Sequence, residues 1–293
     1  MKLYSIGELA LLVQIKPHTI RIWEQRYNLL TPSRSEGNTR YYSEEQLMKL
    51  LNIALLNKNG LKISHIAKLS EEELSEKTSE LIINDRSTEL AIEQLMIASL
   101  KFDQNRISEL FDTFNEQQGI ENTFEKIIFP FLRIVGNLWI NGKITPGHEH
   151  FFSNLCRLRL FSAIDQLNFK LKYEKQIVFL LPEWDYHELG ILYYHYLFKG
   201  AGYPCTYLGQ AVPANDAIQT SAAIKADYLI ITFIGPTNPD KILNYLEIIL
   251  QKTDQLKIYI SGPHVNFPLD DHNGRLIIFD SMNALIEQFK LKC

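Results

Sequence analysis

The chain has 293 residues, of which 46% are hydrophobic and 22% are charged. This length exceeds that of one ordinary domain, and this composition excludes fibrous and disordered chains. No apolar run reaches the roughly 18 to 20 residues that span a bilayer, and residues 1–14 lack the basic start of a signal peptide. We therefore expect a cytoplasmic protein with no membrane contact. The three cysteines, Cys156, Cys205 and Cys293, share no CxxC spacing and indicate buried or incidental thiols.

Charge is distributed unevenly along the chain. Residues 1–70 contain ten Lys and Arg against five Glu, a net charge of +5, whereas residues 71–293 contain 20 basic against 29 acidic residues, a net charge of −9. A basic head suits the phosphate backbone of a nucleic acid, while the acidic remainder would be repelled from it. This asymmetry favours a nucleic-acid partner for the N-terminal part.

The first 70 residues show helical spacing interrupted by turns. Apolar residues recur at helical spacing before and after a tight turn at residues 14–17, and Pro17 suits the first position of the second helix. Residues 32–42 break this periodicity and predict a small β wing that closes on a Gly-Asn turn. A capping box at Ser43 then opens a helix over residues 43–57.

The remainder of the chain changes character twice. Residues 71–86 are acidic and polar, and predict a linker or a linking helix. Residues 89–170 contain four amphipathic helical patterns, separated by Asp103, Gly119 and a turn at residues 145–147, which predict a small helical bundle. From there on, five apolar runs alternate with helical stretches, as in a parallel doubly wound sheet. These runs cover residues 177–181, 203–208, 228–234, 257–260 and 276–279.

These patterns predict a multidomain protein of α and α/β class. We expect a winged helix-turn-helix head at residues 1–72, a linker at 73–88, a helical cap bundle at 89–172 and a Rossmann-like domain at 173–293. The last domain is expected to hold a doubly wound, flavodoxin-like parallel sheet of five strands.

The second predicted helix has the composition of a recognition helix. Five residues on its polar side suit a helix lying in the major groove of DNA: His18, Thr19, Arg21, Arg26 and Tyr27. The wing adds side chains for flanking phosphates: Arg34, Arg40, Tyr41 and Tyr42. A solvated basic face on an ordinary helical hairpin would not need a wing that turns on glycine and carries two arginines. We expect Glu24 to orient a basic neighbour rather than to touch DNA.

Four segments of the head resemble the winged helix-turn-helix of the MerR family of transcriptional regulators. They are Tyr-Ser-Ile-Gly-Glu-Leu-Ala at 4–10, Pro-His-Thr-Ile-Arg-Ile-Trp-Glu at 17–24, Leu-Leu-Thr-Pro at 29–32 and Arg-Tyr-Tyr at 40–42. The resemblance implies that Arg21, Arg34 and Arg40 contact double-stranded DNA, mostly at phosphates, which position the head without reading sequence. MerR relatives that sense metals carry cysteines just beyond the head, whereas the first cysteine here is Cys156, so metal sensing is disfavoured.

A polar motif follows the first strand of the predicted sheet. Asp185, His187 and Gly190 form an Asp-x-His-x-x-Gly sequence at the carboxyl end of this strand, where doubly wound sheets bind ligands. A carboxylate two residues before an imidazole can accept one ring N–H, fix the tautomer and raise the basicity of the other nitrogen. These are the properties of a metal ligand. A lone Asp-x-His pair is more often an ordinary pair of polar loop residues, so the motif needs support from elsewhere.

The sequence around this motif resembles the cobalamin-binding domain shared by methionine synthase, methylmalonyl-CoA mutase and the light-responsive CarH regulators, which carries the same motif. The resemblance implies that His187 is the lower axial ligand of cobalt, in place of the dimethylbenzimidazole base of cobalamin. It also implies that Asp185 supports this ligand and that Gly190 leaves room for the nucleotide tail.

Two further positions keep the spacing of this family but differ in residue type. Thr232 and Ile234 stand where the family has Ser-x-Leu lining the slot of the nucleotide tail, and Ser261 with Gly262 stands where it has Gly-Gly. Thr232 keeps the hydroxyl and Ile234 keeps the apolar wall. Ser261, however, adds a side chain where a close approach of the backbone is expected.

The predicted bundle resembles the cobalamin cap of the same regulators. Trp139, Glu149 and His150 follow the Trp-x9-Glu-His order of that cap, in which the Trp packs against the upper adenosyl group with the Glu-His pair beside it. In the light sensors a histidine directly follows this Trp and caps cobalt after photolysis. Here Ile140 takes that position, and His148 or His150 could substitute for the missing histidine.

Together these resemblances imply a regulator rather than an enzyme. The leading hypothesis is a DNA-binding repressor that responds to adenosyl- or methylcobalamin and to light, and whose assembly as a dimer or tetramer is set by a corrinoid held between cap and sheet. The alternative is a MerR-type regulator whose domain no longer binds corrinoid and serves oligomerisation or another ligand, which Thr232, Ser261 and Ile140 favour. Corrinoid-dependent methyl transfer or isomerisation is disfavoured, because the chain has no room for a substrate-activating partner domain.

Overall fold

The computed structural model describes residues 3–13, 15–35, 38–84, 88–140, 144–168, 170–263, 265, 272–279, 282–289 and 291. The chain forms two compact units, Met1–Ser153 and Asn154–Cys293, each with its own core. Helix α9 (Pro146–Gln166) begins in the first unit and ends in the second. In the described part of the chain, no helix is long and apolar enough to cross a membrane.

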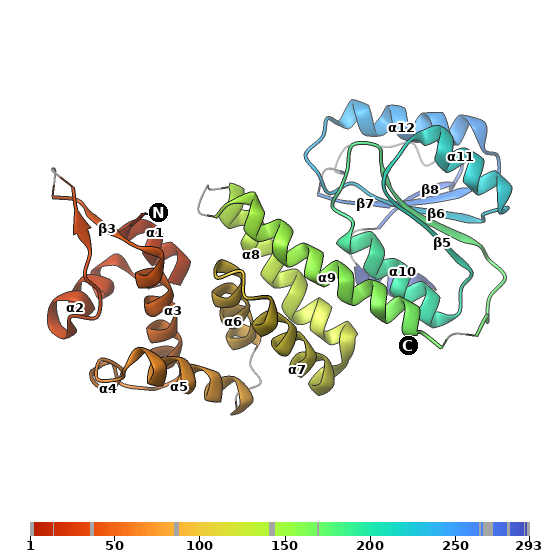
Figure 1. The fold of residues 1–293 in the computed structure, drawn as a ribbon. Coiled ribbons are helices and arrows are strands. Elements are labelled where there is room, and N and C mark those ends of the chain that lie inside the picture. The colour runs from red at the N-terminus through yellow and green to blue at the C-terminus, as the bar shows by residue number, and fades with distance from the viewer. Residues whose placement is uncertain are drawn as a thin grey trace. The chain divides into compact units, whose positions relative to one another are not determined.

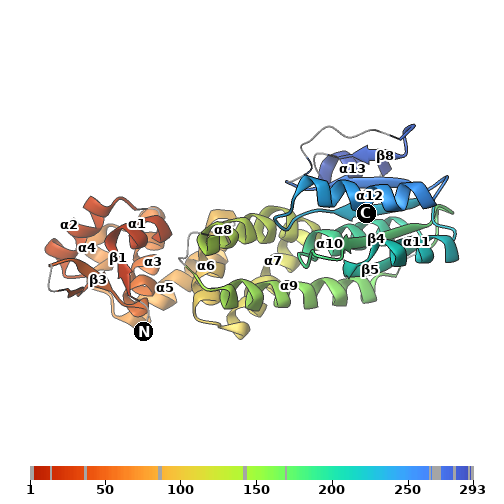
Figure 2. The ribbon, with the colours of Figure 1, turned by 90° about the horizontal axis from the view of Figure 1, so that it is seen from above.

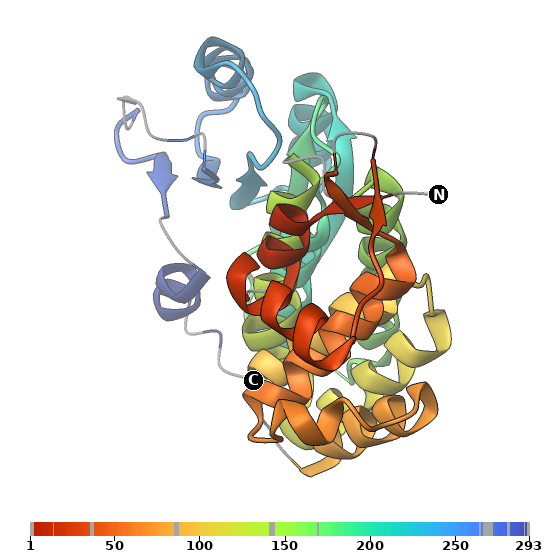
Figure 3. The same ribbon diagram turned by 90° about the vertical axis from the view of Figure 1, so that its left-hand side faces the viewer.

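The first unit begins with a helix-turn-helix and a wing. Its elements are β1 (Tyr4–Ser5), α1 (Ile6–Val13), α2 (Pro17–Tyr27), β2 (Ser33–Arg34) and β3 (Arg40–Tyr42). The three strands form an antiparallel sheet in the order β1-β3-β2. Pro17 begins α2, where its missing N–H is not needed, and Asn28 ends the helix in the left-handed conformation. The β2–β3 hairpin projects from these helices (Figure 3), and the expected turn residue Gly37 lies outside the described residues.

Three helices follow the wing: α3 (Glu44–Lys58), α4 (Ile63–Ile66) and α5 (Glu71–Asn84). The expected capping box opens α3, because Ser43 Oγ accepts a hydrogen bond from the backbone N–H of Gln46 and Gln46 Oε1 accepts one from the N–H of Ser43. Helix α5 occupies most of the segment 73–88, where we expected a linker or a linking helix. Its residues Leu74 and Thr78 are buried and the helix packs on α3, so the chain is folded through this segment as far as α5 extends.

A helical bundle completes the first unit. It contains α6 (Thr88–Leu100), α7 (Gln104–Thr123), a π-helical turn (Phe124–Ile128), α8 (Phe129–Ile140) and the start of α9. The helix breaks fall where the sequence predicts them, because Asp103 caps the first turn of α7 and Gly119 interrupts it with a φ of 79°. Fully buried aromatic rings fill the bundle core: Phe124, Phe131 and Phe152.

The second unit is a doubly wound α/β domain. It contains β4 (Ile177–Pro182), α10 (Leu189–Ala201), β5 (Cys205–Val212), α11 (Ala214–Ala223), β6 (Tyr228–Thr232), α12 (Pro239–Lys252), β7 (Lys257–Ser261), β8 (Leu276–Ile278) and α13 (Met282–Phe289). The strands form a parallel sheet in the order β5-β4-β6-β7-β8. The predicted fold class, including the five-stranded parallel sheet, is confirmed.

The two faces of the sheet are covered by different helices. Helices α11 and α12 lie on one face, where Val178 and Leu180 of β4 join their core, and α10 lies on the other (Figures 1 and 2). Helix α13 shares the α10 face, because Phe289 packs on Phe198. Strand β4 lies between β5 and β6, and the chain continues from β4 to β5 on one side while β6 lies on the other. The loop after β4 is therefore the topological switch point, where ligands bind in such sheets.

Candidate functional site

Helix α2 presents a basic surface to solvent. Ile20 and Trp23 are buried against the head, whereas His18, Arg21 and Arg26 are exposed. Residues three apart on a helix are neighbours, so His18 and Arg21 lie on one outward face. Thr19 is half-buried at the flank of this face. Two of the predicted DNA-contacting residues, His18 and Arg21, are therefore exposed on the same side of the helix.

Glu24 joins this helix to the wing. Its carboxylate accepts a hydrogen bond from Arg40 Nε at 3.0 Å and another from the hydroxyl of Tyr42 at 2.8 Å. Burial and these contacts with Glu24 raise the pKa of Tyr42, so this hydroxyl remains a donor. Glu24 orients a basic neighbour, as the sequence indicates. The exposed Arg34 bonds to Asn38 Oδ1 at 2.6 Å near the tip of the hairpin, and Tyr41 is half-buried.

In the second unit, Asp185 holds His187 at the switch point. Asp185 Oδ1 accepts hydrogen bonds from His187 Nδ1 at 2.8 Å and from the backbone N–H of His187 at 3.0 Å. A carboxylate only accepts, so Nδ1 carries the ring proton and Nε2 keeps the lone pair that coordinates a metal. The Asp185 side chain is fully buried, while the His187 side chain is 50% exposed. This arrangement directs a basic ring nitrogen away from a buried anchor.

The same carboxylate fixes the loop after β6. Asp185 Oδ2 accepts from the backbone N–H groups of Ile234 at 2.7 Å and Gly235 at 2.8 Å. Burial alone would raise the pKa of Asp185, but the hydrogen bonds from His187, Gly235 and Ile234 outweigh it and hold this pKa at about 2. A Cβ atom at Gly235 would lie 3.3 Å from Asp185 Oδ1, tighter than an ordinary contact. Asp185 therefore ties two loops together as an ionised carboxylate.

A second buried carboxylate belongs to Glu188, the residue that follows His187 in the chain. Glu188 is 7% exposed, its Oε1 lies 2.9 Å from Arg157 Nε on α9, and its Oε2 accepts from the Tyr207 hydroxyl on β5 at 2.8 Å. His195 of α10 stacks on the Tyr207 ring, and burial, reinforced by Lys199, lowers the pKa of His195 to about 4. Our reading of the sequence missed this network, because its members are far apart in the chain and form no motif.

The expected tail-slot residues meet at the ends of β6 and β7. Thr232 and Ser261 are paired in register, so their side chains point to the same face of the sheet. Thr232 is 2% exposed, and its hydroxyl has no hydrogen-bond partner among the described residues. The Ser261 hydroxyl hydrogen-bonds to Tyr194 of α10.

The glycines of the predicted site differ in their surroundings. A Cβ atom at Gly190 would meet nothing within 4 Å, so the start of α10 faces open space. A Cβ atom at Gly262 would instead collide with the carbonyl oxygen of Phe233. Only glycine fits at position 262, which explains why the second position of the family's Gly-Gly pair is glycine here. It does not explain the first position, where this chain has Ser261.

The predicted cap residues belong to the first unit. Trp139 and Ile140 end α8, and their side chains lie outside the described part of the structure. His150 Nδ1 lies 2.7 Å from Glu149 Oε2 near the start of α9, and the His150 side chain is 70% exposed. His148 Nδ1 contacts Thr145 Oγ1 at 2.8 Å, and its ring stacks on Phe102 with 4.4 Å between ring centroids.

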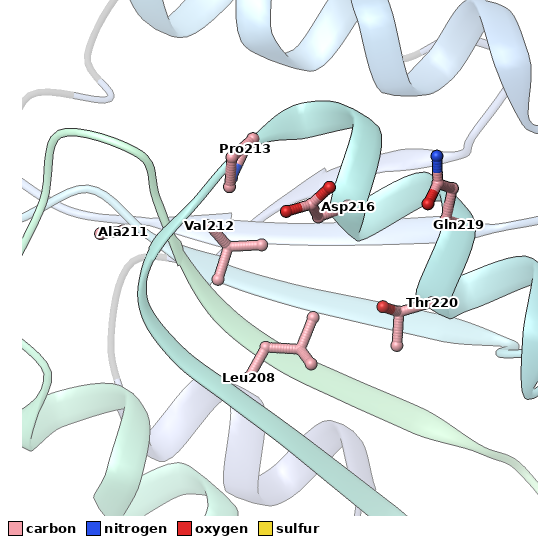
Figure 4. Close-up of a pocket in the computed structure, with 7 residues that line it drawn as sticks. All are labelled: Leu208, Ala211, Val212, Pro213, Asp216, Gln219 and Thr220. Carbon is pink, nitrogen blue, oxygen red and sulfur yellow. The ribbon is translucent and has the colours of Figure 1, made fainter.

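A surface hollow of about 350 Å³ lies elsewhere in the second unit, between β5 and α11. In Figure 4, Leu208 and Val212 of β5 face polar side chains of α11 such as Asp216. Thr220 and Gln219 complete its α11 side. None of the predicted site residues lines this hollow, although the backbone N–H of Ala211 at its edge donates to the carbonyl oxygen of Asp185 at 3.2 Å.

Comparison with known proteins assigns the head. Residues 4–73 match the MerR HTH family of regulatory proteins. The HTH-type transcriptional regulator ZntR of Escherichia coli is 30% identical over 115 residues, which cover 38% of this chain and 79% of ZntR. The chain belongs to the MerR family.

Other similarities extend over the body of this MerR-family chain. Residues 91–161, in the bundle, match the B12 binding domain. The HTH-type transcriptional repressor CarH of Myxococcus xanthus is 26% identical over 266 residues, 88% of each chain. The monomethylamine corrinoid protein of Methanosarcina barkeri superposes with a TM-score of 0.55 at 13% identity, covering 70% of this chain and 100% of that protein. The chain thus joins a DNA-binding head to a B12 binding domain and a fold found in a corrinoid protein.

Proposed function

We propose that this chain is a cobalamin-responsive regulator of transcription, in which a corrinoid bound through His187 controls how the head occupies an operator. One observation carries the proposal. His187 is half exposed at the switch point of the sheet, and the buried Asp185 holds the ring proton on Nδ1, which leaves the lone pair on Nε2, the nitrogen that would ligate cobalt. CarH, which aligns with this chain over 88% of its length, is named a repressor. Repression is the mode of regulation that we propose here.

Several residues of the second unit fit a corrinoid. His187 would supply a nitrogen ligand to cobalt, Asp185 would hold the ring proton on Nδ1 so that Nε2 carries the lone pair, and the open space beside Gly190 would admit the ligand. The partnerless hydroxyl of Thr232 would gain a hydrogen bond from a polar group of the ligand. An adenosyl- or methylcobalamin supplies a cobalt–carbon bond that light can cleave.

The bundle would contribute the upper side of the site. By its resemblance to the CarH cap, Trp139 would cover the alkyl group, with Glu149 and His150 beside it. Ile140 cannot coordinate a metal, so we propose that light removes the alkyl group without a second protein ligand taking its place. The response to light is then weaker or more easily reversed than in the light sensors.

Self-association would convert corrinoid binding into DNA binding. One winged head makes few phosphate contacts, and the acidic body repels DNA, so a single copy binds weakly. Joining two or four heads raises their effective concentration at neighbouring half-sites and stabilises the complex. We propose that corrinoid binding sets this dimeric or tetrameric state.

A second proposal is a MerR-type regulator whose body no longer binds corrinoid and serves oligomerisation or another ligand. The hydrogen bond of Ser261 to Tyr194 favours it, because this contact fills space where the cobalamin-binding family has only glycine.

Absorbance spectra of the full chain with added cobalamin separate the two proposals. The wild type should retain cobalamin through gel filtration with the spectrum of histidine ligation, and His187→Ala should lose that spectrum and bind more weakly. His65→Ala is the matched control, because His65 is an exposed histidine of α4 in the head. It should behave as the wild type. A wild-type chain that elutes without cobalamin would contradict the first proposal and favour the second.

A further inference from the structure

Aromatic rings fill the face of the sheet between α10 and α13. The rings pack edge to face, with centroids 5.7 Å apart for Tyr194 and Phe279, 4.9 Å for Phe198 and Phe289, and 5.1 Å for Tyr259 and Phe289. All five side chains are at least nine-tenths buried. Protein interiors pack as densely as organic crystals, so such a cluster leaves little room for a ligand group.

Among the members of this cluster, Tyr194 follows the loop with His187 most closely along the chain. It lies on α10 one turn after Gly190, and its hydroxyl reaches Ser261 at the carboxyl end of β7. Burial raises the pKa of Tyr194 to about 12, and the hydrogen bond with Ser261 partly offsets this rise. The ring therefore extends from α10 over the sheet edge where β6 and β7 end.

The strand ends beneath Tyr194 are fixed in place. Gly262 allows the close approach of its backbone to Phe233, and any side chain there would collide with the Phe233 carbonyl. Beside it, Thr232 keeps a buried hydroxyl that is paired with nothing in the described residues. A buried hydroxyl without a partner is unfavourable, so this position is built for a polar group that the aromatic cluster does not supply.

We propose that Tyr194 determines corrinoid specificity, because its ring competes with the nucleotide tail of a corrinoid for the space above Thr232 and Ser261. The inference rests on the proposed function, in which the corrinoid binds through His187 with its tail directed toward these two residues. The base, ribose and phosphate of the tail are far larger than the space needed for one group to hydrogen-bond the Thr232 hydroxyl. The tail therefore enters only if the Tyr194 ring moves out. A corrinoid without this tail binds without displacing it.

The test compares cyanocobalamin with dicyanocobinamide, which has the same ring but lacks the nucleotide base. Dissociation constants for the full chain are measured by absorbance titration. The wild type should bind cobinamide at least as tightly as cobalamin. Tyr194→Val should strengthen cobalamin binding at least tenfold and leave cobinamide binding within twofold, because it removes the ring and keeps a β-branched apolar residue.

Two control variants separate the ring from other effects. Tyr194→Phe removes only the hydrogen bond to Ser261 and should retain the wild-type preference, since the ring remains. Tyr196→Val removes another buried tyrosine of α10, which stacks on Tyr193, and should leave the ratio of the two constants unchanged. Circular dichroism establishes that each variant is folded.

The possible outcomes discriminate between the two claims. A wild type that binds cobalamin tenfold more tightly than cobinamide would overturn the role of Tyr194 and leave the proposed function standing, whether or not Tyr194→Val folds. A wild type that binds neither corrinoid would overturn the proposed function itself. The role of Tyr194 is supported if the wild type prefers cobinamide and if, of the three variants, only Tyr194→Val shifts this preference toward cobalamin.

Discussion

Replacing Asp185 with Asn tests how the ligand loop is built. An amide has one accepting and one donating side, so the introduced side chain could still accept from the N–H groups of Ile234 and Gly235. Its NH₂ group would then face the two donors of His187 that Asp185 Oδ1 now accepts. The backbone N–H would lose its partner, and the imidazole would move its proton to Nε2 in order to accept at Nδ1. We expect both lower stability and weaker cobalt ligation.

The size of the stability loss follows from the pKa. A pKa of about 2 for Asp185 in the folded chain, against about 3.9 in an unfolded one, corresponds to about 2.5 kcal/mol of stabilisation at pH 7. Because the folded value is depressed, this stabilisation is present above about pH 4 and is lost as the pH falls toward 2. The Asp185→Asn chain should therefore be less stable by about 2 kcal/mol at pH 7, with the difference shrinking below about pH 4.

Urea unfolding followed by Trp184 fluorescence measures this difference, in a background where Trp23 and Trp139 are replaced by Phe so that only the second unit reports. Asp227→Asn is the control, because Asp227 also accepts a backbone N–H, from Gln176, but lies away from His187. It should leave corrinoid spectra unchanged. A stability of Asp185→Asn equal to that of wild type at pH 7, together with unaltered histidine ligation, would refute the anchoring role of Asp185.

Four further outcomes are expected. Arg21→Ala should weaken binding to all DNA sequences similarly, and the slope of log binding constant against log salt concentration should become shallower by about one. An unchanged slope would show that this side chain does not contact DNA. Glu24→Gln should weaken DNA binding although it removes a negative charge, because the wing arginine loses its partner; tighter binding in a filter assay would contradict this. Tyr207→Phe should cost about 1 to 2 kcal/mol in urea unfolding, since a buried carboxylate loses a donor, and no change would show that water replaces it. Illumination of the alkylcobalamin complex should give no bis-histidine spectrum, whereas such a spectrum that disappears in His148→Ala or His150→Ala would identify the substitute ligand.

Local signals in the sequence predicted much of the architecture. The capping box at Ser43, the proline that begins α2 and the non-helical Gly119 act within a few residues, and each has its expected effect in the structure. The five strands also follow from short apolar runs, because strands buried on both faces need no polar alternation. A linking helix was one of the two predictions for the segment of α5, but its packing on α3 was not predicted, because most of its residues are acidic or polar and few are buried.

Long-range contacts account for what the sequence did not predict. Glu188 is buried only because Arg157, 31 residues earlier, and Tyr207, 19 residues later, converge on it from two other elements. The role of Ser261 likewise changes once Tyr194 is seen above it, because a side chain that should obstruct a ligand instead holds an aromatic ring. Neither contact follows from spacing along one element.

Measuring DNA binding by the full chain, with and without cobalamin, tests whether cobalamin controls the head. Duplexes selected from random sequence by the chain itself provide the operator, and affinities are measured in the dark at one fixed salt concentration. Bound adenosylcobalamin is expected to change the DNA affinity of the wild type at least tenfold, together with its oligomeric state measured by light scattering, and to have no such effect on His187→Ala. Identical DNA affinities for the free chain and for the chain with cobalamin bound would contradict this expectation.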